Sequence, residues 1–375
     1  MTPAGAYLAA VDRVIQEVVE PAAAQVDASG SFPRAGIQAL GQSGLLGLVS
    51  ATEVGGQGEG LRAAALVVER LAQACASTAM VVCMHYAASA LIEAHGPHAV
   101  REQIASGRHL STLAFSETGS RSHFWAPLST ASIEGGHAIL NASKSWVTSA
   151  GEADSYVWSS RPVNAEGAST LWLAPANTPG LEVSGPFDGL GLRGNSSRPV
   201  KATNAAIPAA NRLGEDGKGF DLMMGVVLPY FQLMSAAVSI GIMESATTKA
   251  ATHLGQVRYE HLDQTAADMP TNRAYIARAR IKTDLARALL RDTLNAAETG
   301  APETMLRVLE VKAAAGEAAT EVTDLAMRVA GGAGFRKELG VERHFRDARA
   351  ATVMAPTTDT LYDFIGRIVV GLPLF

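Results

Sequence analysis

The chain has 375 residues, of which 47% are hydrophobic and 18% are charged, and its formal net charge is −5 at pH 7. This length is enough to bury a sizeable core divided into two or three structural units. Because no block of Lys and Arg stands out, the charge pattern gives no reason to expect nucleic acid or an anionic membrane as a partner. A small-molecule ligand is expected instead.

The two cysteines, Cys75 and Cys83, lie in an apolar run that predicts a buried helix. Eight helical residues separate them by about 12 Å, too far for a disulfide, and neither belongs to a metal-ligand motif. We expect both cysteines to be reduced core residues, and we expect no metal site.

The N-terminal segment lacks the features of a signal peptide, and no apolar run reaches the roughly 18 to 20 residues of a membrane span. The expected location is the cytoplasm.

The order of predicted elements is helices, then strands, then helices. Residues 1–112 show apolar side chains at three- and four-residue spacing, which predicts an N-terminal α-helical domain. Residues 113–212 hold short segments rich in Val, Trp, Leu and Thr between Gly, Pro and Asn turns, which predicts a middle antiparallel β domain. Residues 213–375 return to helical spacing and predict a C-terminal four-helix bundle. The fold class is therefore α+β.

Four motifs along this order carry a resemblance to a known family. They are "LAFSETGSRSH" at 113–123, "KSWVTSAGEADSYV" at 144–157, "GLGLRGNSSRPV" at 189–200, and "VAGGAGF" followed by "RHFRDAR" at 329–349. In this order and spacing, the chain resembles the acyl-CoA dehydrogenase superfamily of flavoproteins over essentially its whole length. The resemblance implies an FAD-dependent oxidoreductase whose middle domain is barrel-like.

The motif "KSWVTSA" contains the first expected flavin contacts. Alternation along a strand would place Trp146 and Thr148 on one face, so that an indole packs on the flavin ring and a hydroxyl reaches its polar edge. The resemblance assigns both residues to cofactor binding and makes the Thr148 hydroxyl a catalytic candidate. From the residues alone, a core tryptophan and an ordinary strand threonine is the plainer interpretation.

The motif "FSETGSRSH" supplies further cofactor contacts by resemblance. Phe115 and Ser116 match positions beside the flavin pyrimidine, and Ser122 matches a pyrophosphate ligand. The chain departs from the family pattern at Arg121 and His123, which add a cationic and titratable pair. His123 is therefore a catalytic candidate, while stabilisation of the phosphate or of the loop explains Arg121 equally well.

The glycine motif after the long helix implies an oligomer. In the family this turn lies against the adenosine half of a FAD held by a neighbouring subunit, which would make Gly331, Gly332 and Gly334 cofactor contacts in a homodimer or homotetramer. A simple glycine helix end is the alternative interpretation. Arg258 is the remaining candidate for the FAD phosphate.

The usual catalytic carboxylate of the family is absent. Counting from Arg346-Asp347-Ala348 places Met354, Ala355, Pro356 and Thr357 where a Glu is expected. The alternative site for the base, next to an arginine that helps to bind CoA, is occupied by Phe231 and Gln232. Phe231, Gln232, Met354 and Ala355 are thus expected to line a substrate pocket, and Thr357 is expected both to contact the cofactor and to serve as a catalytic hydroxyl.

Three functions remain open from the sequence. The segment "ADMP" at 267–270 looks like the oxygen-using branch of the superfamily, whose chemistry needs an apolar pocket and no strong α-proton base, so an FAD-dependent oxygenase acting on a CoA thioester or a similar acyl or aromatic substrate is the leading hypothesis. The alternative is an α,β-dehydrogenase whose base has moved to Asp359, Asp363 or His123. The third is a flavin-binding protein with little activity.

Overall fold

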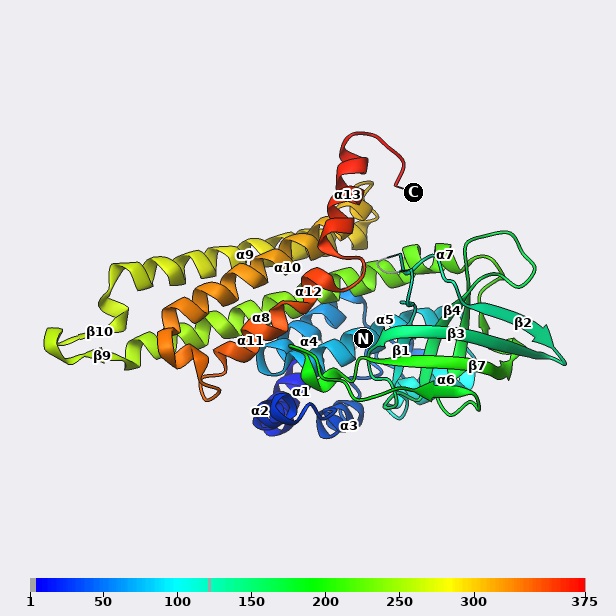
Figure 1. Cartoon of the computed structure of the whole chain (residues 1–375), viewed down its shortest axis with the longest axis horizontal. Helices are drawn as coiled ribbons and strands as arrows, with labels where there is room; N and C mark the ends of the chain where they lie inside the picture. Colours follow the sequence, from blue (N-terminus) through cyan, green and yellow to red (C-terminus); the bar gives the residue numbers. More distant parts are fainter. Residues whose placement is uncertain (1–4, 121–122, 375) are drawn as a thin grey trace. The chain divides into compact units, whose positions relative to one another are not determined.

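The computed structural model describes residues 5–120 and 123–374 (Figure 1). Helices, then strands, then helices follow one another along this part of the chain, which confirms the α+β prediction. By their contacts the residues form two compact units. The first unit holds the residues up to Val67, Met80–Asp188 and Arg193–Phe231, and the second holds Val68–Ala79, Gly189–Leu192 and the chain from Gln232 onward.

The N-terminal helices form where apolar side chains recur at helical spacing, as at the buried Val11 and Val14. Gly30, with φ of 65°, ends the second helix in the left-handed conformation that glycine adopts without steric cost. Cys75 lies between two helices and Cys83 inside the next one, and both thiols are buried and free. The helices are α1 (Ala6–Val14), α2 (Glu20–Ser29), α3 (Arg34–Gln42), α4 (Leu61–Ala74), α5 (Ala76–His95) and α6 (His98–Ala105).

The strands form two four-stranded sheets, ordered β1-β4-β5-β8 and β2-β3-β7-β6. All pairs are antiparallel except β1 and β4, which run parallel because the connection between them passes through the other sheet. The strands are β1 (Ser111–Ala114), β2 (Thr130–Glu134), β3 (His137–Val147), β4 (Ser155–Ser160), β5 (Thr170–Pro175), β6 (Leu181–Val183), β7 (Arg198–Pro208) and β8 (Arg212–Leu213).

The core of the strand region lies around β4 and β5. Trp158 and Trp172 are paired across these strands and both are fully buried. The indole N–H of Trp172 donates to the Ser160 hydroxyl over 2.9 Å, so this large side chain is buried with its polar atom satisfied. The two tryptophans therefore fix the sheet from which the flanking loops emerge.

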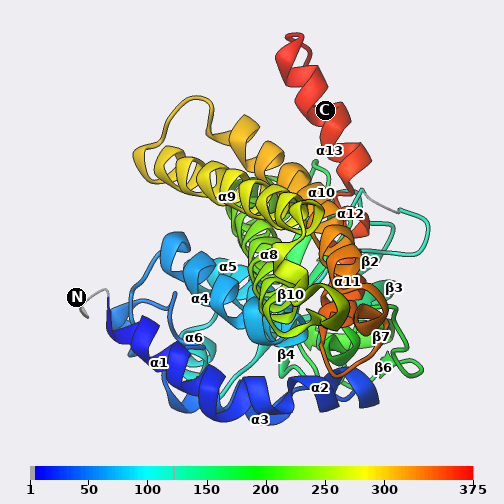
Figure 2. The same ribbon diagram turned by 90° about the vertical axis from the view of Figure 1, so that its left-hand side faces the viewer.

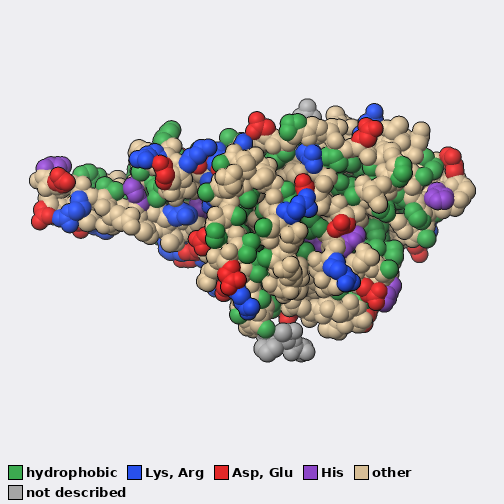
Figure 3. All heavy atoms as spheres, turned by 90° about the horizontal axis from the view of Figure 1, so that it is seen from below, with side chains coloured by type: hydrophobic (Ala, Val, Ile, Leu, Met, Phe, Trp, Pro, Cys, Tyr) green, Lys and Arg blue, Asp and Glu red, His purple; other side chains and the backbone are tan. Residues whose placement is uncertain are grey.

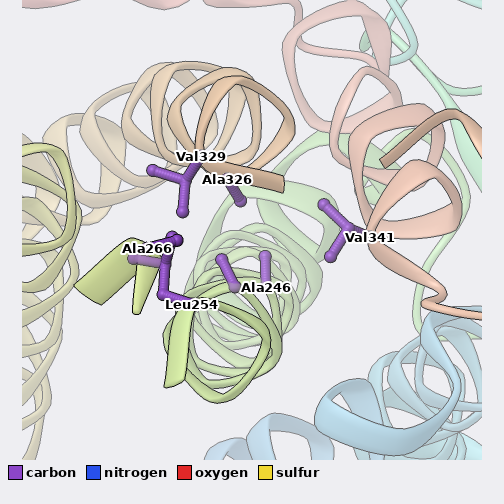
Figure 4. Close-up of a cluster of buried hydrophobic side chains, with 7 residues drawn as sticks. Ala246, Leu254, Ala266, Ala326, Val329 and Val341 are labelled. Carbon is purple, nitrogen blue, oxygen red and sulfur yellow. The ribbon is translucent and has the colours of Figure 1, made fainter. Parts of the chain in front are cut away.

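The C-terminal helices α8, α9 and α10 run side by side (Figure 2). Small and branched side chains fill the space between α8, α10 and α11, among them Ala246, Leu254, Val329 and Val341 (Figure 4). The elements are α7 (Gly219–Leu222), α8 (Leu228–Gln256), β9 (Arg258–Tyr259), β10 (Gln264–Thr265), α9 (Pro270–Thr299), α10 (Thr304–Ala330), α11 (Val341–Ala348), α12 (Ala350–Val353) and α13 (Thr358–Val369).

Two helices are apolar and long enough to cross a membrane, Ala76–His95 and the continuous helical stretch Gly219–Gln256. The expectation that no apolar run is long enough for a membrane span is therefore wrong by length and composition. In each, 83% of the apolar window is buried inside the protein, as is usual for a core helix. Length and composition are therefore weak evidence that either helix crosses a membrane.

On the face drawn in Figure 3, Lys and Arg side chains are interspersed with Asp and Glu.

Candidate functional site

The end of strand β3 departs from regular strand geometry at Trp146. This residue has φ of 56°, and the pairing of β3 with β7 shifts its register between Lys144 and Val147. The indole is 71% exposed, whereas Thr148, two residues further on, is only 2% exposed. The regular alternation from which a shared face is expected does not continue to Thr148, because the bulge interrupts it.

Three non-glycine residues with left-handed backbone conformations lie close together at this point. They are Trp146, Ser149 and Ser196, with φ of 56°, 60° and 50°. The N–H of Ser149 donates to the carbonyl of Asn195 over 2.9 Å, which joins the end of β3 to the loop before β7. Each such conformation costs about 1–3 kcal/mol and persists where the surroundings impose it, typically at functional sites.

Hydroxyl groups surround these strained residues. The Thr148 and Ser197 hydroxyl oxygens lie 3.1 Å apart, and the Ser196 hydroxyl donates to the Ala150 carbonyl over 3.0 Å. The buried Ser149 hydroxyl and the side-chain oxygen of Asn195 have no hydrogen-bond partner in the described part of the chain. We refer to these residues together as the β3-end cluster: Trp146, Thr148, Ser149, Asn195, Ser196 and Ser197. Apart from Trp146 and Thr148, the sequence analysis missed its members, although the motif at 189–200 contains three of them.

A buried ion pair fixes the loop after β1 against β3. The Lys144 ammonium donates to Glu117 Oε1 over 2.5 Å and to the Ser159 carbonyl over 2.7 Å. Burial lowers the pKa of Lys144 to about 8, against the attraction of Glu117. Burial alone would raise the pKa of Glu117, but the Lys144 ammonium and hydrogen bonds from Ser129 and Leu128 hold it below its ordinary value.

One predicted contact in this loop, Ser116, lies next to the β3-end cluster in space. The carbonyl of Ser116 accepts a hydrogen bond of 2.9 Å from the N–H of Ser145, the residue before Trp146. Phe115 is buried, and its ring stacks on that of Phe124. His123 is exposed, with its ring packed edge-to-face against Trp125. Two further expectations from this motif, Arg121 and Ser122, lie outside the described residues.

In the second unit, residues 354–357 form a non-helical turn between α12 and α13. Met354 and Ala355 are half-buried, and the Thr357 hydroxyl caps α13 by accepting a hydrogen bond of 3.4 Å from the N–H of Thr360. Asp359 and Asp363 are exposed on α13. Ala355 and Asp359 do not lie on one continuous helix, because α13 begins only at Thr358.

Helix α8 carries the other two residues expected in the substrate pocket. Phe231 is 7% exposed and Gln232 is fully buried. Neither the oxygen nor the nitrogen of the Gln232 amide has a hydrogen-bond partner among the residues described, and an unpaired buried amide costs about 1–3 kcal/mol. At this position, which the sequence predicts to line a substrate pocket, the structure therefore holds a buried amide.

The remaining sequence candidates lie in loops of the second unit. Arg258 is exposed and forms an ion pair with Asp263 in the hairpin of β9 and β10. The glycine motif ends α10 as predicted, with Gly331 at φ of 54°, and a 3₁₀ turn follows over Gly331–Phe335. Gly331 and Gly332 are exposed and Gly334 is buried. The segment "ADMP" leads from a 3₁₀ turn over Ala266–Asp268 into α9, which begins at Pro270. Asp268 accepts hydrogen bonds from Thr265 in the capping box of that turn, so these residues have a structural explanation.

The β3-end cluster has the groups that a flavin needs. An exposed indole offers a flat aromatic face, and adjacent hydroxyls offer dipoles for the polar edge of the ring. Buried oxygens without a protein partner, on Ser149 and Asn195, are what a site leaves for a ligand or for ordered water. The residues present therefore fit FAD. The described residues contain no group of three or more His, Cys, Asp or Glu side chains that could hold a metal ion.

Comparison with known proteins assigns the family. The acyl-CoA dehydrogenase N-terminal, middle and C-terminal domain models match residues 5–107, 112–205 and 217–370. The mitochondrial short-chain specific acyl-CoA dehydrogenase of Bos taurus is 30% identical over 367 residues, covering 94% of this chain and 85% of the relative. The probable acyl-CoA dehydrogenase YngJ of Bacillus subtilis is 27% identical over 368 residues, covering 95% and 93%.

Solved structures are similar over nearly the whole chain. The butyryl-CoA dehydrogenase from Megasphaera elsdenii has a TM-score of 0.91 at 22% identity, covering 99% of this chain and 98% of that one. A glutaryl-CoA dehydrogenase in complex with glutaryl-CoA has a TM-score of 0.91 at 26% identity, covering 97% and 94%. With all three domains matched, the chain belongs to the acyl-CoA dehydrogenase family and is an FAD-dependent oxidoreductase.

Proposed function

We propose that the protein oxidises the acyl group of a CoA thioester by α,β-dehydrogenation. The observation that carries the proposal is the β3-end cluster, where the exposed Trp146 indole and the Thr148 hydroxyl provide the features of a flavin site. The relatives named as acyl-CoA dehydrogenases support the choice of substrate class. The oxygenase hypothesis thereby becomes the second candidate.

The reaction removes a proton from the α carbon and a hydride from the β carbon of the thioester. Bound FAD would supply the hydride acceptor. We assign the proton to the carboxylate of Asp359, because Ala355 cannot accept one and Asp359 is exposed in the first turn of α13, immediately after the turn that carries Ala355. Met354 and the half-buried Ala355 present apolar groups beside that turn, which would exclude water from the reacting carbons.

The second candidate function, a flavin oxygenase, rests on the absence of a catalytic base at the expected positions. Ala355 stands where a proton-abstracting carboxylate is expected, and the alternative position on α8 holds Phe231 and Gln232. A flavin oxygenase of the same fold needs no strong base at either position. The segment "ADMP" supports this candidate less than its sequence suggests, since its Asp268 also caps the 3₁₀ turn before α9.

An anaerobic titration tests the proposal. The FAD-loaded protein is mixed with saturated acyl-CoAs of different length, and the visible absorbance of the flavin is followed. We expect bleaching by at least one acyl-CoA, and a loss of about 100-fold in the rate of bleaching in Asp359→Asn. Asp363→Asn, one turn further along α13, is the matched control and should bleach at the wild-type rate.

Two other outcomes would favour the alternatives. If no acyl-CoA bleaches the flavin, while chemically reduced protein converts a thioester in air, the protein is an oxygenase. If neither reaction occurs and the flavin stays bound, it is a binding protein. The same acyl groups on pantetheine distinguish recognition of the acyl chain from recognition of the nucleotide.

We also propose that the active form is a homo-oligomer in the cytoplasm. The exposed Gly331 and Gly332, together with Phe335, whose side chain is 85% exposed, are suited to contact with a neighbouring subunit. Light scattering of the FAD-loaded protein checks the oligomeric state, and a monomer would contradict this proposal.

A further inference from the structure

Lys312, which the proposed reaction does not use, is a buried cation in the middle of helix α10. Its side chain is 1% exposed, and its ammonium donates hydrogen bonds to three carbonyl oxygens: those of Ala351 at 3.1 Å, Met354 at 3.0 Å and Pro356 at 2.8 Å. All three acceptors belong to the short segment 351–356, which comprises most of α12 and the start of the turn before α13. One side chain thus ties this segment to α10 at three points.

The hydrogen bonds of the Lys312 ammonium indicate a structural role for this side chain. An ammonium has three N–H donors and no acceptor, so three carbonyl oxygens match its hydrogen-bonding capacity. Burial lowers the pKa of Lys312 to about 7, and the carbonyl dipoles act in the opposite direction because they stabilise the charged form. An amine whose protons point at backbone carbonyls holds a segment in place and does not serve as a proton acceptor for a substrate.

A second residue on the same face of α10 lies against the same segment. Gly316 lies one helical turn after Lys312, and a Cβ atom placed there would lie 3.3 Å from the Cβ of Ala351. Glycine costs about 1 kcal/mol in a helix interior, so its presence here allows α12 to approach α10 closely. Next to it, Glu317 accepts a hydrogen bond from Tyr362 of α13, which raises the pKa of that phenol to about 12.

We propose that Lys312 is a positioning residue, whose ammonium fixes the turn 354–357 so that Ala355, Thr357 and the start of α13 take one defined arrangement for the reaction. The inference rests on the proposed function insofar as this turn contributes to catalysis. Helix α10 provides the rigid support, since Lys312 is the ninth of its 27 residues and lies about two turns or more from either end. Removing the ammonium leaves three buried carbonyl oxygens without this donor, and the turn then samples other conformations.

Hydrogen exchange of the FAD-loaded protein tests the positioning directly. In Lys312→Met, which keeps the length of the side chain without its donors, amides of residues 352–360 should exchange about tenfold faster than in the wild type. Thr323→Val is the matched control on the same helix: it removes a buried hydroxyl that donates to Ala319 over 2.7 Å, about three turns after Lys312. Its exchange in residues 352–360 should stay at the wild-type rate.

Catalysis gives the second measurement. The value of kcat with the acyl-CoA that bleaches the flavin best should fall about tenfold in Lys312→Met, with KM nearly unchanged, because misplacement of the turn affects the reacting geometry more than binding. Lys312→Gln keeps an amide donor and should recover part of kcat. Gly316→Val leaves the ammonium intact and displaces Ala351 by steric contact, so it should reproduce the loss if the arrangement of the turn is what matters.

Wild-type exchange in residues 352–360 of Lys312→Met would overturn the proposal, as would faster exchange with unchanged kcat. If the wild type itself oxidises no thioester, the proposed function fails, and the flavin absorbance spectrum then decides the role of Lys312. A shifted visible band in Lys312→Met supports positioning of the turn against the cofactor, and a band identical to that of the wild type overturns it.

Discussion

The Trp146 indole is held outside the core by a backbone conformation that few tryptophans adopt. Because the side chain is 71% exposed, it contributes little to the stability of the protein without cofactor. We expect Trp146→Ala to leave the melting temperature of the FAD-free protein within about 2 °C of the wild type and to weaken FAD binding about tenfold. Thermal unfolding with and without added FAD measures both effects.

The matched control is Leu128→Ala, which removes another exposed apolar side chain of the same unit, 48% of it accessible. FAD should raise the melting temperature of this variant as much as that of the wild type. Thr148→Ala should also weaken FAD binding, since it removes the hydroxyl next to Ser197. Wild-type FAD affinity in both Trp146→Ala and Thr148→Ala would show that the cofactor does not contact the β3-end cluster.

Individual residues of the site were only partly predictable from the sequence. Trp146 and Thr148 follow from the family motif, but the bulge that separates their side chains depends on pairing with β7, more than 50 residues away in the chain. Ser149 and Asn195 became candidates only through their unpaired buried oxygens, which no local pattern of residues reveals. The family motif therefore predicted which region binds the flavin, and only the tertiary structure showed which side-chain atoms are available there.

At the level of elements, the ion pair of Glu117 and Lys144 determines where the loop after β1 lies. Removing one partner leaves the other charge buried, which typically costs about 3–5 kcal/mol. We expect Lys144→Met to lower the free energy of unfolding by about that amount, and the double variant with Glu117→Gln to recover part of it. Urea unfolding of the single and double variants measures the coupling.

An exposed pair provides the comparison. Arg336 and Glu338 form an ion pair of 2.8 Å with both side chains largely in solvent, so Arg336→Met should leave the unfolding midpoint unchanged. A Lys144→Met variant as stable as this control would mean that the buried pair does not hold the loop.

The contacts between elements explain why sequence reasoning missed Lys312. The residue lies 39 to 44 positions before the carbonyls that it contacts, and within its own helix it is one cation in a run of small and apolar residues. The break at Pro356, by contrast, follows from local rules, because proline disfavours helix at the preceding residue. Local rules therefore predict the turn, whereas the hydrogen bonds from Lys312 that hold it are visible only in the folded structure.

For the whole molecule, the order of helical and strand regions was predictable because the hydrophobic period changes along the chain, and the α+β architecture follows from it. The boundaries at residues 112 and 212 remain predictions, since contacts group the N-terminal helices with the strands. The preference for oxygen chemistry depended on the missing carboxylate at Ala355, and the whole-chain relatives favour dehydrogenation instead. The missing carboxylate at one position is therefore weaker evidence for the function than similarity over the full length of the chain.

The stability of the whole molecule should fall in mild acid because of buried histidines. The Nε2 of His85 lies 3.0 Å from the Leu46 carbonyl, its Nδ1 accepts from the Ser111 N–H, and burial lowers its pKa to about 4. An unfolded histidine takes up its proton near pH 6.5, so between these values the unfolded chain binds more protons. The free energy of unfolding should therefore decrease from pH 6.5 towards pH 4, by at most about 3 kcal/mol for this group.

The variant His85→Gln provides both an acceptor and a donor without a proton to gain. Urea unfolding at a series of pH values should show a shallower acid dependence for His85→Gln than for the wild type. His137→Gln, at an exposed histidine of β3, should keep the wild-type dependence. Equal slopes in all three proteins would exclude His85 as a source of the acid sensitivity.

The unpaired oxygens and exposed indole of the β3-end cluster also have a consequence for the protein in a living cell. A cofactor that binds only the folded chain stabilises it by about 2.7 kcal/mol when its concentration is one hundred times its dissociation constant. Molecules that lack FAD would therefore unfold more often and be degraded sooner. The amount of this protein in the cell should rise and fall with the supply of riboflavin, and Trp146→Ala should make that amount low at every level of supply.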